Sequence, residues 1–269
     1  MAEIMTINSI VIAASIFLLW IVSAILKDAS IIDIFWGPGF GLIALTTFLA
    51  TDAPGPLGLL LMALTLLWSI RLGSHLGTRW ITHGRVEDGR YAAMRKRAGS
   101  NFILTSFFKV FAFQGILMWT ISLPLQFGIA LGGETPLGFL TWIGCPLFAA
   151  GFILEALADS QLRDFKSDPE NTGKTMQAGA WAWSRHPNYF GNACLWWGLF
   201  LIAAQAPYAI WTIFSPALMT YLLLRVSGVA LLERRLARSI PSYAAYQKSV
   251  NAFVPLPPKQ NQHKQIEKK

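Results

Sequence analysis

The sequence is poor in charged residues and in cysteine, and both shortages exclude classes of protein. Only 13% of its 269 residues are charged, roughly half of the share that is usual in soluble domains, about 25%. Cys145 and Cys194 lie inside apolar runs and give neither a disulfide framework nor the spacing of a metal site. The N-terminus lacks the charged region and the cleavage site of a cleaved signal peptide. Such a composition is typical of an integral membrane protein.

Common catalytic motifs are also missing. The histidines at 75, 83, 186 and 263 form no HxxxH or HxxHH box, which argues against a membrane di-iron desaturase. The chain has no Walker loop, no HExxH, no GxSxG and no GxGxxG after a strand. We therefore expect no metal, and we expect any dinucleotide to be held by helix ends rather than by a Rossmann turn.

Long apolar runs fill most of the chain instead. The sequence is 54% hydrophobic and its mean hydropathy is +0.46. This predicts an all-α polytopic membrane protein, a bundle of about seven transmembrane helices. Region 1–257 forms a single transmembrane domain in this interpretation, and the polar tail at 258–269 is disordered. The predicted spans lie near 7–26, 31–50, 56–76, 102–130, 137–158, 187–206 and 208–232.

The basic residues predict an orientation. The connections near 51–55, 131–136 and 206–207 contain no Lys or Arg, so all 22 basic residues lie on the opposite side. The positive-inside rule then places the N-terminus outside and the C-terminus inside. We expect a multi-pass protein of a bacterial inner membrane, with an active site that faces the cytoplasm. Anionic headgroups and an anionic cofactor account for the net charge of +8 without nucleic acid.

An acidic pair marks the inner end of the fifth predicted span. Glu155 and Asp159 are four residues apart, so they share one helix face. Two like charges at the edge of a bilayer need compensation. One interpretation is that a cation, or a ligand rich in hydrogen-bond donors, binds the two carboxylates. The other is that nearby Arg and Lys side chains form structural ion pairs with them.

The segment WSRHPNYFGN opens the sixth span. Pro187 suits the first turn of a helix, and Arg185 and His186 stand just before it. The free N–H groups at a helix start attract anions. Asn188 and Asn192 share the inward face, so the segment suits a phosphate or a nucleotide. The alternative is a capped helix with snorkelling side chains at the interface.

A third polar segment, LRVSGVALLERRLARSIPSYAAYQ, follows the seventh span. Arg225 and Glu233 approach the inner surface, and Ser227 and Gly228 permit close helix packing. Arg225 is the stronger candidate for a site. The basic run that follows could be a positive-inside anchor; it comprises Arg234, Arg235 and Arg238.

The N-terminal half supplies DIFWG and RLGSHLGTR. Asp33 lies within the apolar second span, where an ionisable residue indicates a function or a structural ion pair. Arg71 and His75 are four residues apart and share one helix face. His75 could donate a proton near neutral pH, or it could be a packed polar residue. The segment EDGRY, which ends at Tyr91, lies in the long internal loop, where its carboxylates could simply balance the arginines.

These segments together resemble the steroid 5-alpha-reductase superfamily. The likeness spans about 30–257 and rests on GAWAWSRHPNYFGN, EALADSQLRDF, LRVSG…LLERR and the closing Y…Y…FVPLPP. The bacterial DUF1295 branch also shares DIFWG and RLGSHLGTR in similar form. The resemblance implies a seven-helix membrane protein that binds NADPH from the cytoplasm and reduces a C=C bond conjugated to a carbonyl in a lipid-like substrate.

The resemblance also implies that residues 1–130 form a substrate-binding half and residues 137–257 a cofactor-binding half. We expect Asp33, His75 and Arg71 to be catalytic, with one of them stabilising the carbonyl oxygen. The family has a glutamate where Asn192 stands, and Leu76 falls near a substrate-holding tyrosine, so a steroid substrate is not implied. The expected cofactor-binding residues are Glu155, Asp159, Arg163, Arg185, His186, Asn188, Tyr189, Asn192, Arg225, Glu233 and Tyr246.

Two other functions stay open at this point. The RHPxY and late Glu…Y…Y…P pattern also occurs in isoprenylcysteine carboxyl methyltransferases, which bind S-adenosylmethionine. A third possibility is a lipid-binding membrane protein without catalytic activity. The sequence leaves the lipid substrate and the oligomeric state undetermined.

Overall fold

The computed structural model describes residues 1–226, 228–240 and 242–258, without the side chains at 231, 235 and 239. Every regular element in these ranges is a helix, so the all-α prediction is confirmed. Ser227, the side chain of Arg235 and the predicted tail from 259 onward lie outside the described residues.

The chain divides into two compact units. Unit 1 comprises Met1–Trp142 and Leu199–Ser215, and unit 2 comprises Ile143–Gly198 and the chain from Pro216 onward. The roles predicted for a substrate half, 1–130, and a cofactor half, 137–257, stay predictions.

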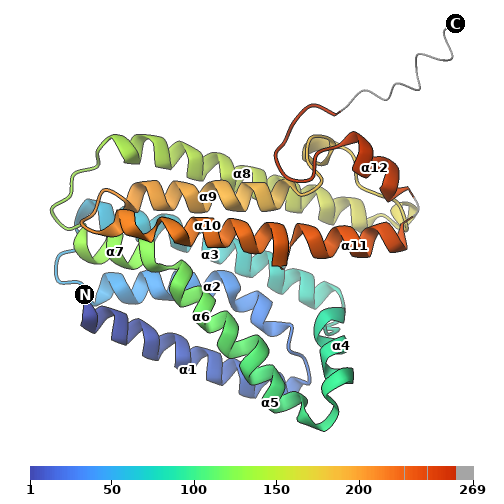
Figure 1. Ribbon diagram of the computed structural model, residues 1–269, viewed down its shortest axis with the longest axis horizontal. Coiled ribbons are helices and arrows are strands. Elements are labelled where there is room, and N and C mark those ends of the chain that lie inside the picture. The colour runs from blue at the N-terminus through green and yellow to red at the C-terminus, as the bar shows by residue number, and fades with distance from the viewer. Residues whose placement is uncertain (227, 241, 259–269) are drawn as a thin grey trace, which may run out of the picture. The chain divides into compact units, whose positions relative to one another are not determined.

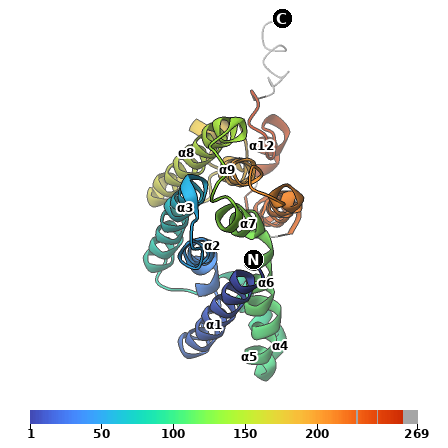
Figure 2. The same ribbon diagram turned by 90° about the vertical axis from the view of Figure 1, so that its left-hand side faces the viewer.

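Unit 1 is a helical bundle in which α2 lies between α1 and α3 (Figures 1 and 2). Its fourth helix, α4, stands at an angle to these three helices (Figure 1). The helices of this unit are α1 (Ala2–Leu26), α2 (Ile31–Leu49), α3 (Gly55–Thr82), α4 (Gly89–Ala98), α5 (Phe102–Ser106), α6 (Phe113–Ile121) and α7 (Leu123–Leu131). Short helices η1 (Gly99–Asn101), η2 (Phe107–Ala112) and η5 (Ala209–Ile213) complete it.

The fourth predicted span is not one uninterrupted helix. A continuous helical stretch runs from Gly89 to Ile121, and η2 within it is π-helical. The stretch ends at Ser122, and α7 then begins with Pro124 in its first turn. Proline has no N–H to continue the preceding helix, which explains the break. The apolar run at 102–130 therefore forms two separate packing elements.

A buried polar cluster joins three helices of unit 1. The Asn8 side chain donates to Thr47 Oγ1 at 2.8 Å and to Gln126 Oε1 at 3.0 Å, and it accepts from Thr46 Oγ1 at 2.5 Å. These residues come from α1, α2 and α7. Hydrogen bonds of this kind hold helices together where all the surroundings are apolar.

Unit 2 contains most of the long helix α8 (Phe139–Ser167) and of the helix α9 (Pro187–Ala203), which lie side by side (Figure 1). Glycines let their backbones touch, since a Cβ on Gly191 would lie 2.6 Å from the carbonyl oxygen of Gly151. The remaining elements of this part of the chain are η3 (Pro169–Asn171), η4 (Gly179–Ala182), α10 (Phe214–Tyr221), the π-helix η6 (Leu222–Val226), α11 (Val229–Ser239) and α12 (Tyr243–Ser249).

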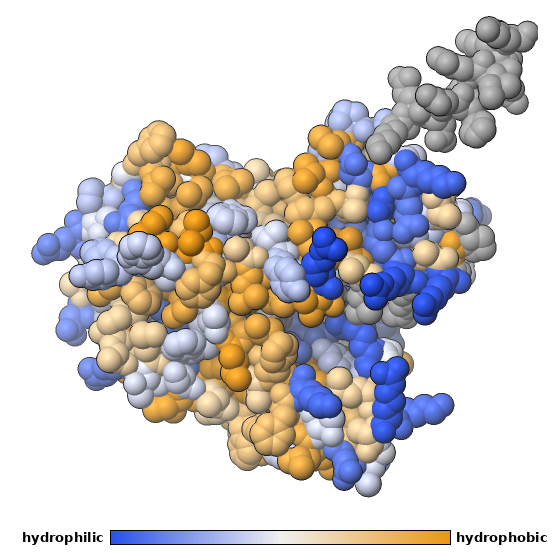
Figure 3. Space-filling model, viewed as in Figure 1, coloured by the Kyte–Doolittle hydropathy of each residue, from blue (hydrophilic) through white to orange (hydrophobic). Residues whose placement is uncertain are grey.

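Six helical stretches of the described residues are long and apolar enough to cross a membrane. The predicted sixth span corresponds to α9, which has 17 residues and is shorter than these six. Hydrophobic residues cover much of the surface in Figure 3, and hydrophilic residues gather around α4 in unit 1. The chain thus has the helices of a multi-pass membrane protein.

Candidate functional site

Two carboxylate–amide contacts connect α8 and α9 in unit 2. Asn192 Nδ2 donates to Glu155 Oε2 at 3.3 Å, and Asn188 Nδ2 donates to Asp159 Oδ1 at 3.0 Å. Both carboxylates are buried. The close backbone packing at Gly191 brings the helices near enough for these short side chains to meet. The structure thus brings four predicted cofactor residues together in one polar strip.

The start of α9 is built around His186 and Tyr189. Their rings stack with centroids 5.6 Å apart and planes inclined by 2°. The Tyr189 N–H donates to Asn188 Oδ1 at 3.0 Å, which satisfies one of the free donors of the first turn. Gly228 packs against the Tyr189 ring, since a Cβ there would lie 3.0 Å from Tyr189 Cε2. The close packing predicted at Gly228 is therefore confirmed.

Glu233 is the centre of a second polar cluster in unit 2. Its carboxylate accepts two hydrogen bonds from Arg185, at 2.6 and 2.8 Å, and one from Tyr243 Oη at 3.0 Å. Gln247 Nε2 donates at 2.8 Å, and His186 Nε2 lies 3.2 Å away. Burial by itself raises the pKa of Glu233, but these hydrogen bonds and the Arg185 charge outweigh burial. The resulting pKa of Glu233 is well below its usual range.

The same cluster ties the C-terminal segment to the loop before α9. Arg185 Nη1 donates to the carbonyl oxygens of Gln247, at 2.8 Å, and Val250. Tyr246 Oη donates to the Trp181 carbonyl oxygen at 2.5 Å, and burial raises the pKa of this phenol. The start of α9 is thus stabilised by a largely buried cluster of polar side chains, which comprises Arg185, His186, Glu233 and Tyr246.

Two predicted cofactor residues point to the surface. Arg163, near the end of α8, is exposed and donates to Ser160 Oγ at 2.8 Å and Asp164 Oδ1 at 3.2 Å. Arg225, on the π-helix η6, is also exposed. Their guanidinium groups are accessible to an anionic ligand, in contrast to that of Arg185.

Asp33 lies at the centre of a charged cluster in unit 1. Its Oδ2 accepts from Arg90 at 2.6 Å, and its Oδ1 accepts from Tyr91 Oη at 2.7 Å. Gln114 Nε2 donates to the same phenol oxygen at 3.2 Å. Arg90 and Tyr91 open α4, and Gln114 follows the π-helix η2. Irregular helices of this type are frequent at functional sites.

The sequence predicted Asp33 but missed its partners. The only signal for them was EDGRY, in which Arg90 and Tyr91 stand next to two carboxylates. Arg71 and His75 lie half-buried on one face of α3, and the side-chain partners of Asp33 among the described residues are Arg90 and Tyr91. The structure therefore places a carboxylate–guanidinium–phenol cluster at Asp33, and the catalytic roles expected of Asp33, His75 and Arg71 stay predictions.

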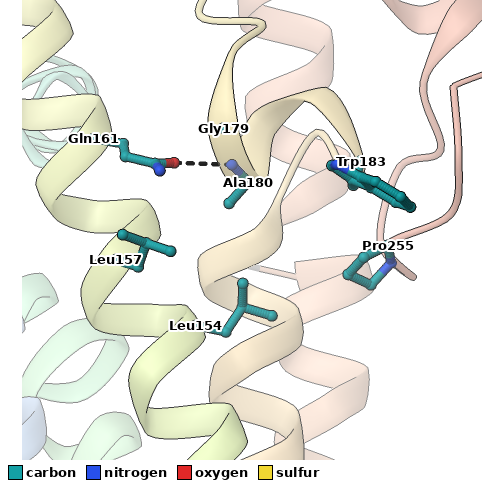
Figure 4. Close-up of a pocket in the computed structure, with 7 residues that line it drawn as sticks. All are labelled: Leu154, Leu157, Gln161, Gly179, Ala180, Trp183 and Pro255. Carbon is teal, nitrogen blue, oxygen red and sulfur yellow. Dashed lines mark hydrogen bonds between the residues drawn. The ribbon is translucent and has the colours of Figure 1, made fainter.

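A groove of 340 Å³ runs along another face of α8. Leu154 and Leu157 form one wall, and Gln161 binds the Ala180 N–H at 2.9 Å at one end (Figure 4). Trp183 and Pro255 line the opposite side (Figure 4). Helical spacing directs these leucines away from the acidic pair of α8. The groove is thus mainly apolar and separate from the polar strip.

Comparison with known proteins identifies a family. Residues 19–250 match the family described as "Protein of unknown function (DUF1295)". The chain belongs to this family. The match covers the polar strip and the Glu233 cluster of the DUF1295 protein, together with the Asp33 cluster.

A relative of this DUF1295 protein exists in fission yeast. The uncharacterized protein C594.04c of Schizosaccharomyces pombe is 28% identical to this chain over 261 residues. The match covers 88% of this chain and 75% of the relative. No solved structure matches the chain.

Proposed function

We propose that this DUF1295 protein is a membrane reductase that uses NADPH to reduce a C=C bond conjugated to a carbonyl in a hydrophobic, steroid-like or other lipid substrate. This is the chemistry implied by the resemblance to the steroid 5-alpha-reductase superfamily. The observation that supports it best is the Asp33–Tyr91 pair, a carboxylate and a phenol 2.7 Å apart at the start of two helices. In the steroid enzymes a glutamate and a tyrosine hold the substrate carbonyl.

The cluster favours Tyr91 as the group that donates to the substrate. Arg90 lies 2.6 Å from Asp33 Oδ2 and holds the carboxyl group in place. The other oxygen, Oδ1, accepts from Tyr91 Oη at 2.7 Å, so Asp33 orients the phenol. Gln114 donates to the phenol oxygen and fixes it from the other side. This proposal moves the donor role from Asp33, His75 or Arg71 to Tyr91.

The reaction needs charge stabilisation at one oxygen. When bound, NADPH would supply the hydride that the β carbon of the conjugated system accepts. The electron pair of the C=C bond moves toward the carbonyl, so negative charge develops on its oxygen. Tyr91 has one O–H, so its proton turns from Asp33 Oδ1 to this oxygen and donates there. Such stabilisation of developing charge is usually the largest contribution to catalysis. A proton taken up at the α carbon then gives the saturated carbonyl compound.

The polar strip of unit 2 has the chemistry of a dinucleotide site. The carboxylates Glu155 and Asp159 accept hydrogen bonds from ribose hydroxyls, and the amides of Asn188 and Asn192 both donate and accept. The exposed guanidinium of Arg225 suits a phosphate group. Arg163 offers a second exposed guanidinium. Under this proposal the buried Glu233 cluster supports the strip without direct contact with phosphate.

The proposed topology retains seven spans. Because about 17 residues are the lower limit for crossing a bilayer, α9 is included as a span. The N-terminus is then outside, and the polar ends of α8, α9 and α11 face the cytoplasm of a bacterial cell.

Nucleotide titration tests this function. The thermal midpoint of the purified protein is measured in mild detergent with NADPH, NADH or S-adenosylmethionine. A ligand at 100 times its Kd stabilises a protein by about 2.7 kcal/mol, so NADPH should raise the midpoint clearly. Asn188→Ala should abolish this rise, whereas Gln177→Ala, which removes an exposed amide of the same unit, should not.

Two results would reject the proposal. Stabilisation by S-adenosylmethionine alone would identify a methyltransferase. Stabilisation by none of the three nucleotides would favour a lipid-binding protein without catalytic activity.

A further inference from the structure

A second cavity, of 300 Å³, lies in unit 1 between the end of α1 and the start of α5. Figure 1 shows α5 beside the C-terminal end of α1. The cavity contains no residue of the Asp33 cluster. Its lining combines two cations, serine hydroxyls and apolar side chains. Among the lining residues are Lys27, Arg95, Ser100, Phe102 and Ile103.

The polar side of this cavity carries two cations, Lys27 and Arg95. Lys27 is exposed at the C-cap of α1. Arg95 donates to both carboxylate oxygens of Glu87, at 2.7 and 3.0 Å. Asp28 is buried and accepts from Trp80 Nε1 at 2.7 Å. Lys27 and Arg95 therefore line the cavity, and the carboxylates of Asp28 and Glu87 near them are already hydrogen-bonded.

The Arg95 side chain forms a rigid wall. Its guanidinium stacks 3.9 Å above the centre of the Phe102 ring while it is held by Glu87. A cation that is fixed in this way loses little conformational freedom when an anion arrives. Lys27 is the mobile cation of the pair, and its flexible stem can adjust to a ligand.

The opposite side of the cavity continues into an apolar surface. Ile103 lines the cavity and is 54% exposed, and its neighbour Leu104 is 64% exposed. On α1, Ile25 is 73% exposed. Trp20 Nε1 donates to the Ile103 carbonyl oxygen at 3.1 Å and joins α1 to α5 at this level. The cavity thus has a cationic end and an exposed hydrocarbon end within a helix surface suited to a bilayer.

We infer that this cavity binds the headgroup of an anionic phospholipid. The phosphodiester lies against Lys27 and the face of Arg95 that is turned away from Glu87. The Ser100 hydroxyl is placed to donate to it, and one acyl chain follows Ile103. A soluble phosphate compound would leave the apolar end without a partner, whereas a phospholipid occupies both ends. This inference does not depend on the proposed reductase activity.

Native mass spectrometry of the full chain in detergent tests the site. The protein is mixed with phosphatidylglycerol or with phosphatidylcholine of the same acyl chains, and the retained lipid is measured. Phosphatidylglycerol should be retained preferentially. One Lys near an anionic surface contributes about a fivefold change in affinity, so Lys27→Gln should reduce retention about fivefold and Lys27→Glu more. Ser100→Asp, at an exposed position, should also reduce it.

A matched control separates the site from general surface charge. Lys174→Gln removes an exposed Lys of unit 2 and should leave lipid retention unchanged. Equal retention of both lipids, or an equal effect of Lys27→Gln and Lys174→Gln, would overturn the inference. Binding of inorganic phosphate with the same dependence on Lys27, but without retained lipid, would also overturn it.

Discussion

Asp33 and Tyr91 are 58 positions apart in the sequence, and their side-chain oxygens are 2.7 Å apart in the fold. A carboxylate within an apolar span needs a partner, so the sequence could predict that Asp33 was special. It could not name the partner, because the internal loop offers several cations, and nothing in the sequence places its one tyrosine, Tyr91, against Asp33. The choice of Arg90 and Tyr91 depends on where α4 begins, which is a tertiary property.

The first residue-scale prediction concerns the Tyr91 hydroxyl. Tyr91→Phe keeps the buried ring but removes the proposed donor. The rate of product formation, measured by mass spectrometry with a panel of hydrophobic enones and NADPH, should fall about 10²–10³-fold. Tyr221→Phe, at an exposed position, is the control and should keep the parental rate. An unchanged rate in Tyr91→Phe would remove this residue from the mechanism.

The second residue-scale prediction concerns Glu233. Because its pKa is lowered by folding, its contribution to stability is complete above the unfolded-state value of about 4.3 and is lost as the pH falls below it. Glu233→Gln should destabilise the protein at pH 7 by about 3 kcal/mol, since Arg185 is left buried without its carboxylate. Thermal melts should show this difference shrinking between about pH 5 and pH 3.

The exposed Glu170 provides the comparison for Glu233. Glu170→Gln should melt like the parent protein at each pH. Equal melting of the Glu233 and Glu170 variants at pH 7 would show that the Glu233 cluster does not stabilise the fold.

The helices could be predicted from apolar runs, but their interruptions could not. The runs at 7–26, 31–50 and 56–76 correspond closely to α1, α2 and α3. By contrast, the run at 102–130 is divided at Ser122. Pro124 gave a local signal for this break, whereas hydropathy alone did not. The π-helices η2 and η6 have no comparable signal, because their geometry is decided by packing around them.

An element-scale prediction follows from the contact between α8 and α9. A Cβ on Gly191 would lie 2.6 Å from a backbone oxygen of Gly151 and 2.7 Å from the Glu155 nitrogen. Neither atom can turn away, so Gly191→Ala should separate the helices and cost about 1–3 kcal/mol. It should also weaken NADPH binding in a titration. Gly89→Ala, where nothing lies within 4 Å, should leave the thermal midpoint unchanged or raised. Equal midpoints for the two variants would contradict close packing.

At the scale of the whole molecule, the distribution of basic residues predicts the orientation. Cysteines introduced one at a time, after Cys145 and Cys194 are replaced by Ala, can be labelled in intact cells with an impermeant thiol reagent. Asp52→Cys should react, and Lys174→Cys and Lys248→Cys should react only after the cells are opened. Labelling of Lys248→Cys in intact cells would show that α9 does not span the membrane.

Transfer of deuterium from NADPH labelled at C4 of the nicotinamide tests the central claim most directly. The protein in nanodiscs is incubated with this cofactor and a lipid extract of its source membrane, and the lipids are then analysed by mass spectrometry. Our account predicts a lipid that gains one deuterium and one hydrogen in place of a C=C bond, and its loss in Tyr91→Phe. Transfer of a deuterated methyl group from S-adenosylmethionine, with no deuterium from NADPH entering any lipid, would contradict it.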